Sequence, residues 1–243
     1  MTTVANKDYL IGADKRRTNL LDTGQSNYDD SVVKVFRFGD LYWGQAGMVG
    51  LTQLLGLHIR GYNVTDNILN FLHQCKESKV PDEYVLGQIL VYDAVNDKKF
   101  LYQSPAQHIG GAGVVIECGE IAIPFFSIGS GAEFAFPVLA NGGSVEEAIA
   151  HATTHDEGTG GGIDMAHLQA DLRNVVQLET QQQVHQVQAN QSGDDTVQRH
   201  MMDMGLVGED GVFTERSVSY TATKAINLAE LAKMGLIKNV NSI

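Results

Sequence analysis

The chain has 243 residues, 43% of them hydrophobic and 19% charged, which suits one globular domain with a full core, with or without an appendage. Its formal net charge of −12 has the wrong sign for binding phosphate backbones, and no apolar run reaches the roughly 20 residues that a membrane span needs. We therefore expect neither nucleic acid nor a membrane as a partner. The cysteines, Cys75 and Cys118, show no pairing pattern, which indicates a reducing, cytoplasmic setting.

At the start of the chain, residues 2–14 predict a hairpin. Two strand-like runs flank a polar, turn-forming tripeptide that ends in Asp8. If the turn centres near Asp8, the numbers of facing residues sum to about 16, so Thr2 should lie opposite Asp14.

The rest of the chain alternates between strand and helix patterns. The predicted strands cover residues 31–38, 41–46, 85–95, 99–103, 114–118 and 121–128. The predicted helices cover residues 48–57, 66–75, 145–154, with Ser144 as its cap, and about 222–234. Residues 15–31 read as polar and turn-rich, and residues 181–195 as a solvated helix or a linker. This order of elements suits layered sheets with helices outside.

The second residue carries a chemical signal. Met1 precedes a small residue, the usual context for methionine removal, so Thr2 is expected to become the N-terminus. It would then carry a hydroxyl and an α-amine on one residue, a nucleophile with its own base.

Lys34 gives a second signal. It shares a predicted strand face with Phe36 and Phe38, an alternation that normally marks a buried side. A lysine in that place should have a lowered pKa or an ion-pair partner, for which Asp14 at a strand end is the natural candidate. The alternative is a lysine at the strand edge whose ammonium reaches water.

Six short segments occur in an order that belongs to one known family. They are Thr2-Thr3-Val4, Gly12-Ala13-Asp14-Lys15-Arg16, Val33-Lys34-Val35, Ala46-Gly47, Ile128-Gly129-Ser130-Gly131 and Asp156-Glu157-Gly158-Thr159-Gly160-Gly161. Together they resemble the proteasome β-subunit and HslV family of N-terminal-nucleophile (Ntn) hydrolases over about residues 2–172. The last segment resembles the family's Asp-x-x-Ser-Gly-Gly loop, with Thr159 in the place of the serine.

This resemblance implies an α+β fold, a four-layer αββα sandwich over residues 1–175, followed by a C-terminal helical extension over 176–243. It implies a threonine endopeptidase that hydrolyses peptide bonds in peptides or unfolded proteins inside homo-oligomeric, stacked rings. An ATP-dependent unfoldase is the implied partner, and the chain cannot be that unfoldase because it has no nucleotide-binding loop. No cofactor and no metal are expected.

The resemblance also assigns roles in the reaction. The implied catalytic residues are Thr2, Asp14, Lys34, Gly47, Ser130, Asp156 and Thr159. Thr2 would attack the carbonyl. Lys34, held in place by Asp14, would lower the proton affinity of the Thr2 hydroxyl and amine, and the Gly47 N–H would bind the oxyanion. The other three would support the Thr2 amine.

The pocket for the substrate side chain at the scissile bond (the S1 pocket) departs from the family. The residues implied to bind substrate are Arg17, Thr18, Val32, Gln45, Val49 and Gln53. Gln45 stands where the family often has an apolar or small residue, so we expect a polar pocket. Met48 follows Gly47 where the family usually has a small residue.

Other readings stay open. The same fold could serve as a silent structural or binding protein in which Met1 is retained, or as an Ntn amidase that acts on a small amide. His151 and His155 have a spacing that can bind metal, but no third ligand is arranged beside them. The glycine-rich residues 158–162 lack the ending of a phosphate-binding loop.

Overall fold

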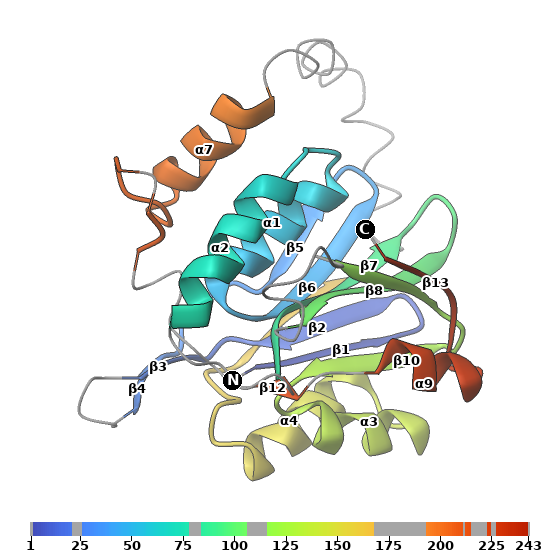
Figure 1. The fold of residues 1–243 in the computed structure, drawn as a ribbon. Helices are drawn as coiled ribbons and strands as arrows, with labels where there is room; N and C mark the ends of the chain where they lie inside the picture. The colour runs from blue at the N-terminus through green and yellow to red at the C-terminus, as the bar shows by residue number, and fades with distance from the viewer. Residues whose placement is uncertain are drawn as a thin grey trace, which may run out of the picture.

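The computed structural model describes residues 2–20, 26–77, 84–105, 116–167, 193–210, 212–214, 223–224 and 227–242. Its strands are β1 (Thr3–Lys7), β2 (Leu10–Asp14), β3 (Arg17–Leu20), β4 (Ser26–Asp29), β5 (Val35–Phe38), β6 (Leu41–Gly47), β7 (Tyr84–Asp93), β8 (Lys98–Pro105), β9 (Glu117–Ile121), β10 (Phe125–Gly129), β11 (Ile163–His167), β12 (Thr223–Lys224) and β13 (Ile237–Ser242). Its helices are α1 (Val49–Ile59), α2 (Thr65–Glu77), α3 (Ala132–Ala140), α4 (Val145–His155), α7 (Gly193–Asp203) and α9 (Leu228–Lys233). The fold is mixed, with antiparallel sheets and helices (Figure 1).

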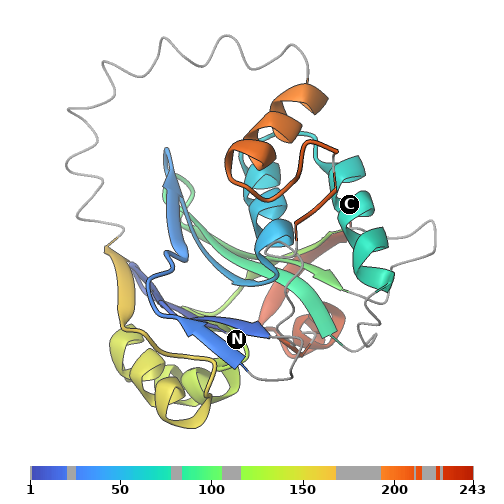
Figure 2. The same cartoon turned by 90° about the vertical axis from the view of Figure 1, so that its left-hand side faces the viewer.

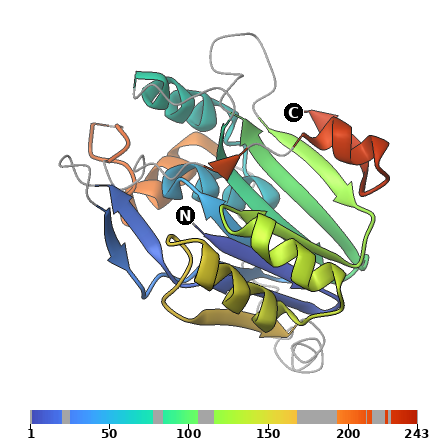
Figure 3. The same ribbon diagram turned by 90° about the horizontal axis from the view of Figure 1, so that it is seen from below.

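A four-stranded antiparallel sheet has the order β10-β1-β2-β11. Helices α3 and α4 cover one of its faces, as the view from below shows (Figure 3). Small and aliphatic side chains fill the space between them, including Ala5 of β1, Leu139 of α3 and Ile149 of α4. This sheet therefore carries the N-terminal strand in its interior.

A seven-stranded antiparallel sheet has the order β13-β9-β8-β7-β6-β5, with β12 paired to β7 off this path. Helices α1 and α2 lie on one face, and α7 lies beside them (Figure 2). The core on this face includes Trp43 of β6, Ile89 of β7, Leu54 of α1 and Val197 of α7.

The two sheets face each other across a second apolar core. Val4 and Ile128 from the smaller sheet meet Tyr42 and Leu90 from the larger one. Strand β1 is buried on both faces. Successive side chains point to opposite sides of the sheet, and each side has its own core. Val4 enters the core between the sheets and Ala5 the core under α3 and α4.

The hairpin prediction is confirmed, but its register is wrong by one residue. The turn consists of Asp8 and Tyr9, and Asp8 has a φ of 51°. Facing residues therefore sum to 17, as in the pair Val4 and Ala13. Asp14 accordingly meets Thr3, whose N–H it accepts, instead of Thr2.

The predicted strand over 31–38 is shorter than expected. β5 begins only at Val35. The residues before it lie beside the segment that follows β2, where the Val32 N–H donates to the Lys15 carbonyl at 3.1 Å. Phe38 is 43% exposed, because β5 is an edge strand. The strand alternation thus predicted the burial of Lys34 correctly and that of Phe38 wrongly.

The predicted strand over 121–128 is in fact two strands in different sheets. β9 ends at Ile121 and β10 begins at Phe125. Pro124 lies between them, and proline cannot donate to a strand ladder. Residues 15–31, expected as loop, contain the paired strands β3 and β4.

The helix predictions for 48–57, 66–75 and 145–154 are confirmed as α1, α2 and α4. The Ser144 cap is also confirmed: its hydroxyl accepts the Glu147 N–H, and the Glu147 carboxylate accepts the Ser144 N–H. No helix among the described residues is long and apolar enough to cross a membrane.

The described residues after 175 pack on the rest of the molecule. β13 pairs with β9, and Leu228 of α9 reaches the core between the sheets. The helix expected over 222–234 is shortened to α9, and residues 223–224 pair with β7. Of the polar run over 181–195, residues 181–192 lie outside the described residues and 193–195 begin α7.

Candidate active site

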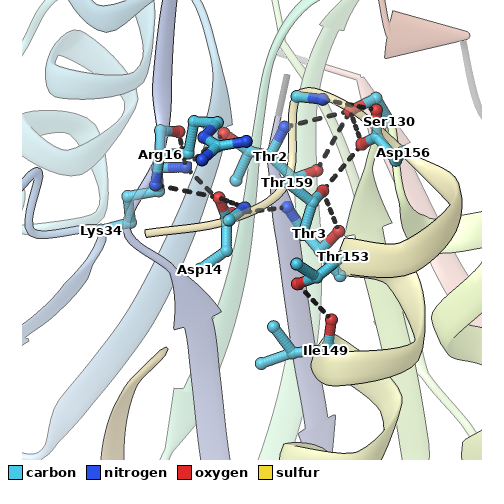
Figure 4. Close-up of polar contacts among 12 residues, drawn as sticks. Thr2, Thr3, Asp14, Arg16, Lys34, Ser130, Ile149, Thr153, Asp156 and Thr159 are labelled. Carbon is cyan, nitrogen blue, oxygen red and sulfur yellow. Dashed lines mark hydrogen bonds and ion pairs between the residues drawn. The ribbon is translucent and has the colours of Figure 1, made fainter. Parts of the chain in front are cut away.

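Two separate groups bind the nitrogen and the hydroxyl of Thr2 (Figure 4). The Thr2 N–H donates to Ser130 Oγ at 3.0 Å, and Lys34 Nζ donates to Thr2 Oγ1 at 2.9 Å. Thr2 is buried, immediately before β1, and Thr3 pairs with Gly129 at the end of β10. The hydroxyl and the nitrogen of one residue thus lie in different polar environments.

The Lys34 ammonium has defined acceptors besides Thr2. It donates to Asp14 Oδ1 at 2.9 Å and to the Arg16 carbonyl. The other Asp14 oxygen accepts the backbone N–H groups of Arg16 and Gly160, both at 3.0 Å. Asp14 is 0% exposed and Lys34 4% exposed, so the ion pair is buried and Asp14 is held by backbone donors.

Burial lowers the pKa of Lys34 below its ordinary value of 10.5, because the ammonium is poorly solvated. The Asp14 carboxylate opposes this change, and Arg16 adds to it through like-charge repulsion. The sequence predicted a lowered pKa or an ion-pair partner for Lys34, and the buried pair with Asp14 confirms the partner over the strand-edge alternative.

A chain of hydroxyl groups surrounds Asp156, the C-terminal cap residue of α4. Its Oδ2 accepts Ser130 Oγ at 2.6 Å and Thr159 Oγ1 at 2.7 Å. The Thr159 hydroxyl donates its one proton to Asp156. In the 2.7 Å hydrogen bond between Thr3 Oγ1 and Thr159 Oγ1, Thr3 must therefore be the donor. Ser130 and Thr159 therefore donate directly to the Asp156 carboxylate, and Thr3 donates to Thr159.

Close backbone approach explains two glycines of the site. Gly129 has a φ of 93°, and a Cβ there would lie 2.0 Å from the Thr2 carbonyl oxygen. Gly47 has a φ of 113°, and a Cβ there would lie 2.5 Å from the Leu86 carbonyl oxygen. The Ala46 side chain lies 3.2 Å from that same Cβ position of Gly129, which puts the end of β6 beside the Thr2 segment.

Met48 does not intrude on this site. Its side chain is buried in the core under α1 and α2, where its sulfur contacts the Cys75 thiol at 3.6 Å. Its N–H donates to the Leu86 carbonyl at 2.7 Å. A large residue is tolerated after Gly47 because the chain turns its side chain into the core on the helix side.

The structure places some of the predicted substrate-binding residues beside Lys34. The Gln45 N–H donates to the Lys34 carbonyl at 3.1 Å, and Arg17 follows Arg16 in the chain. Among the described residues, three buried polar atoms of this group have no hydrogen-bond partner: Arg17 Nε, Thr18 Oγ1 and Gln45 Oε1.

The other predicted substrate-binding residues lie in the segment before Lys34 and on α1. Val32 is half-buried, and its N–H donates to the Lys15 carbonyl. Val49 and Gln53 lie on α1, where Val49 packs against the helix-side core.

Sequence reasoning missed four contributors to the site: Thr3, Arg16, Gly160 and Gln88. Thr3 and Gly160 lie inside the recognised segments, but their partners depend on the register and on loop geometry. Arg16 contributes a carbonyl, and its guanidinium binds Asp30 through two hydrogen bonds of 2.7 and 2.9 Å. Gln88 accepts the Gly129 N–H from the other sheet, and nothing local in the sequence indicates this contact.

The described residues hold no group of three or more histidine, cysteine or acidic side chains that could bind a metal. The rings of His151 and His155 are 4.3 Å apart on α4, and His155 also stacks on Phe134. His155 Nδ1 lies 2.9 Å from the His151 carbonyl oxygen. The described residues around Thr2 supply one buried ion pair, the Asp156 carboxylate, hydroxyls and backbone groups.

Several solved structures resemble this chain, and two of them are described here. BPH from Thiobacillus denitrificans, in complex with epoxomicin, aligns over 68% of this chain and 96% of that one, with 17% identity and a TM-score of 0.42. Eukaryotic HslV from Trypanosoma brucei aligns over 68% of this chain and 97% of that one, with 17% identity and a TM-score of 0.39. No protein-family model and no curated protein matches the sequence. The likeness concerns the fold alone and lends no support to an activity.

Proposed function

We propose that the chain is a threonine-type peptidase with the four-layer αββα fold of the Ntn hydrolases and Thr2 as its nucleophile. One observation carries the proposal: Lys34 Nζ donates to the Thr2 hydroxyl, while the backbone nitrogen of Thr2 donates to the Ser130 hydroxyl. In the full chain this nitrogen is the peptide nitrogen that follows Met1. Cleavage between Met1 and Thr2 would turn it into an amine in the same place.

The reaction follows from these groups. Thr2 Oγ attacks a peptide carbonyl, and its proton passes to the α-amine, whose reference pKa is about 8. The cationic Lys34 lowers the proton affinity of both groups, and Asp14 holds it in place. The tetrahedral intermediate then expels the peptide amine, which takes the proton from the α-ammonium. Water, with its proton accepted by the α-amine, hydrolyses the Thr2 ester and restores the site.

The end of β6 supplies the remaining group. The Gly47 N–H would stabilise the tetrahedral oxyanion, a contribution of about 3 kcal/mol for one donor. The positive φ of Gly47 supports this role, because the backbone there has an orientation that other residues rarely adopt. Ser130, Asp156 and Thr159 keep the nitrogen of Thr2 in place.

The S1 pocket of this peptidase would be polar. Gln45 supports this, because its N–H donates to the Lys34 carbonyl, so the two residues lie opposite each other and their side chains share one face. A library of peptides that varies the residue before the scissile bond should show the best turnover with polar side chains. Best turnover with Phe or Leu would reject the polar pocket.

We further propose that the peptidase works in the cytoplasm as stacked homo-oligomeric rings, with unfolded protein delivered by an ATP-dependent unfoldase. An unspecific peptidase needs restricted access, which a closed chamber provides. The test is simple: in sedimentation at micromolar concentration, the purified protein should run as a large assembly. A monomer would contradict the rings.

The decisive experiment is the intact mass of the purified protein before and after treatment with a peptide epoxyketone. This warhead forms its stable ring only with a hydroxyl and an α-amine on the same terminal residue. We expect loss of Met1 and a one-to-one adduct that is absent in Thr2→Ala. Retained Met1 without an adduct would overturn the proposal in favour of a silent protein on the same fold.

A further inference from the structure

A row of polar side chains crosses three neighbouring strands of the larger sheet. Gln88 of β7 lies directly opposite Gln103 of β8, which lies opposite Glu117 of β9. Gln88 is 0% and Gln103 1% exposed. Leu90 and Leu101, on the same face of the same strands, belong to the apolar core between the sheets. Apolar residues would continue this core, so packing does not require the buried amides.

The row ends at the candidate active site. Gln88 Oε1 accepts the Gly129 N–H at 3.2 Å, a bond from the larger sheet to the end of β10. Gly129 precedes Ser130, whose hydroxyl accepts the Thr2 N–H. Gln88 also lies opposite Ala46, the residue before Gly47. The amide therefore lies between the two backbone segments that the proposed chemistry uses.

The carboxylate at the far end sets the direction of the two side-chain hydrogen bonds that link the row. Ionised Glu117 can only accept, so Gln103 must turn its amide NH₂ toward it, and that bond is 2.8 Å long. The Gln103 carbonyl then faces Gln88 and accepts its NH₂ at 3.4 Å. Gln88 is left with its own carbonyl toward Gly129, which is the orientation that a backbone N–H requires.

From this row we propose that Gln88 is a positioning residue, oriented by Glu117 through Gln103, that holds the Gly129–Ser130 segment against Thr2. The inference rests on the proposed function, because Ser130 matters only if the Thr2 nitrogen reacts. Loss of the bond would let Gly129 and Ser130 shift, and displacements of about 1 Å near reacting atoms cost up to about a hundredfold in rate.

The test compares variants of Gln88 and Glu117 in the full-length protein. Gln88→Met keeps the volume and removes the acceptor, so adduct formation with the epoxyketone should slow at least about tenfold. Glu117→Lys replaces an acceptor with a donor at a half-buried position and should also slow the adduct, with faster hydrogen exchange at Gly129–Ser130. Glu117→Gln can still accept through its carbonyl and should match the wild type in both measurements.

Leu90→Ala provides the control for general loosening, since it weakens the same core without removing a hydrogen-bonding group of the row. If Leu90→Ala slows the adduct as much as Gln88→Met at equal loss of stability, the role of Gln88 is only structural. Equal behaviour of Glu117→Lys and Glu117→Gln would also overturn the inference. Should the wild type form no adduct, the proposed function fails, and the exchange rates at Gly129–Ser130 still decide whether the row holds this segment.

Discussion

The two sides of Thr2 are built on different principles. On one side, which we call the ionic half, Lys34, Asp14 and the Arg16 carbonyl act on the hydroxyl. On the other, the hydroxyl half, Ser130, Asp156 and Thr159 act on the nitrogen.

The ionic half depends on one buried charge pair, in which Lys34 donates to both Thr2 Oγ1 and Asp14 Oδ1. The hydroxyl half is a relay of small groups around one carboxylate, in which a serine and a threonine donate equally well. The difference predicts that the ionic half tolerates no substitution, whereas the hydroxyl half weakens in steps.

The largest effect should follow from Lys34→Met. Removing the ammonium takes away the only cation that contacts Thr2 Oγ1 among the hydrogen bonds described, so the rate of epoxyketone adduct formation should fall by about 10³-fold. Stability should fall by about 3 kcal/mol, because Asp14 loses its counter-ion but keeps backbone donors. Urea unfolding measures the second quantity.

Lys15→Met is the matched control. Lys15 pairs with Asp164 at 3.5 Å, and both side chains are about a third exposed, at 33% and 29%. Its loss should change stability by less than about 1 kcal/mol and leave the adduct rate unchanged. If the two methionine variants behave alike, burial of the Lys34 pair is not what distinguishes the ionic half.

The same variant tests the pKa of Lys34. Because burial lowers this pKa below 10.5, the unfolded chain binds more protons than the folded one between the two values. The stability that this group contributes is therefore fully present above pH 10.5 and is lost as pH falls through the folded pKa. The wild type should gain stability relative to Lys34→Met as pH rises toward 10.5. A difference that is flat or shrinks over this range would show that the charged form is not penalised.

A smaller effect should follow from Ser130→Ala in the hydroxyl half. The Thr2 nitrogen loses its acceptor, but Asp156 keeps Thr159 and the Gly158 N–H, so the adduct rate should fall by about tenfold to a hundredfold. Thr159→Ser retains the donor and should stay close to wild type. If Ser130→Ala lowers the adduct rate as much as Lys34→Met does, the two halves are equally sensitive to substitution, contrary to the comparison.

Prediction from the sequence was most successful where the signal is local. The helices at 48–57, 66–75 and 145–154 and the Ser144 cap follow from periodicity and capping over a few residues. The same reasoning failed at 121–128, because the chain changes sheets at Pro124, and alternation does not show to which sheet a strand belongs.

The amino-acid sequence by itself indicated Thr2, Lys34 and Asp14 as chemical groups of the site, and the family resemblance added Ser130, Asp156 and Thr159. The tertiary structure decided which atoms meet. Thr2 and Ser130 are 128 positions apart and touch only because β1 pairs with β10. The turn at Asp8 and Tyr9 places Asp14 against Thr3 instead of Thr2, because the numbers of facing residues on β1 and β2 sum to 17 and not to 16. Gln88 reaches Gly129 from another sheet, and such a contact has no local signature because packing between sheets creates it.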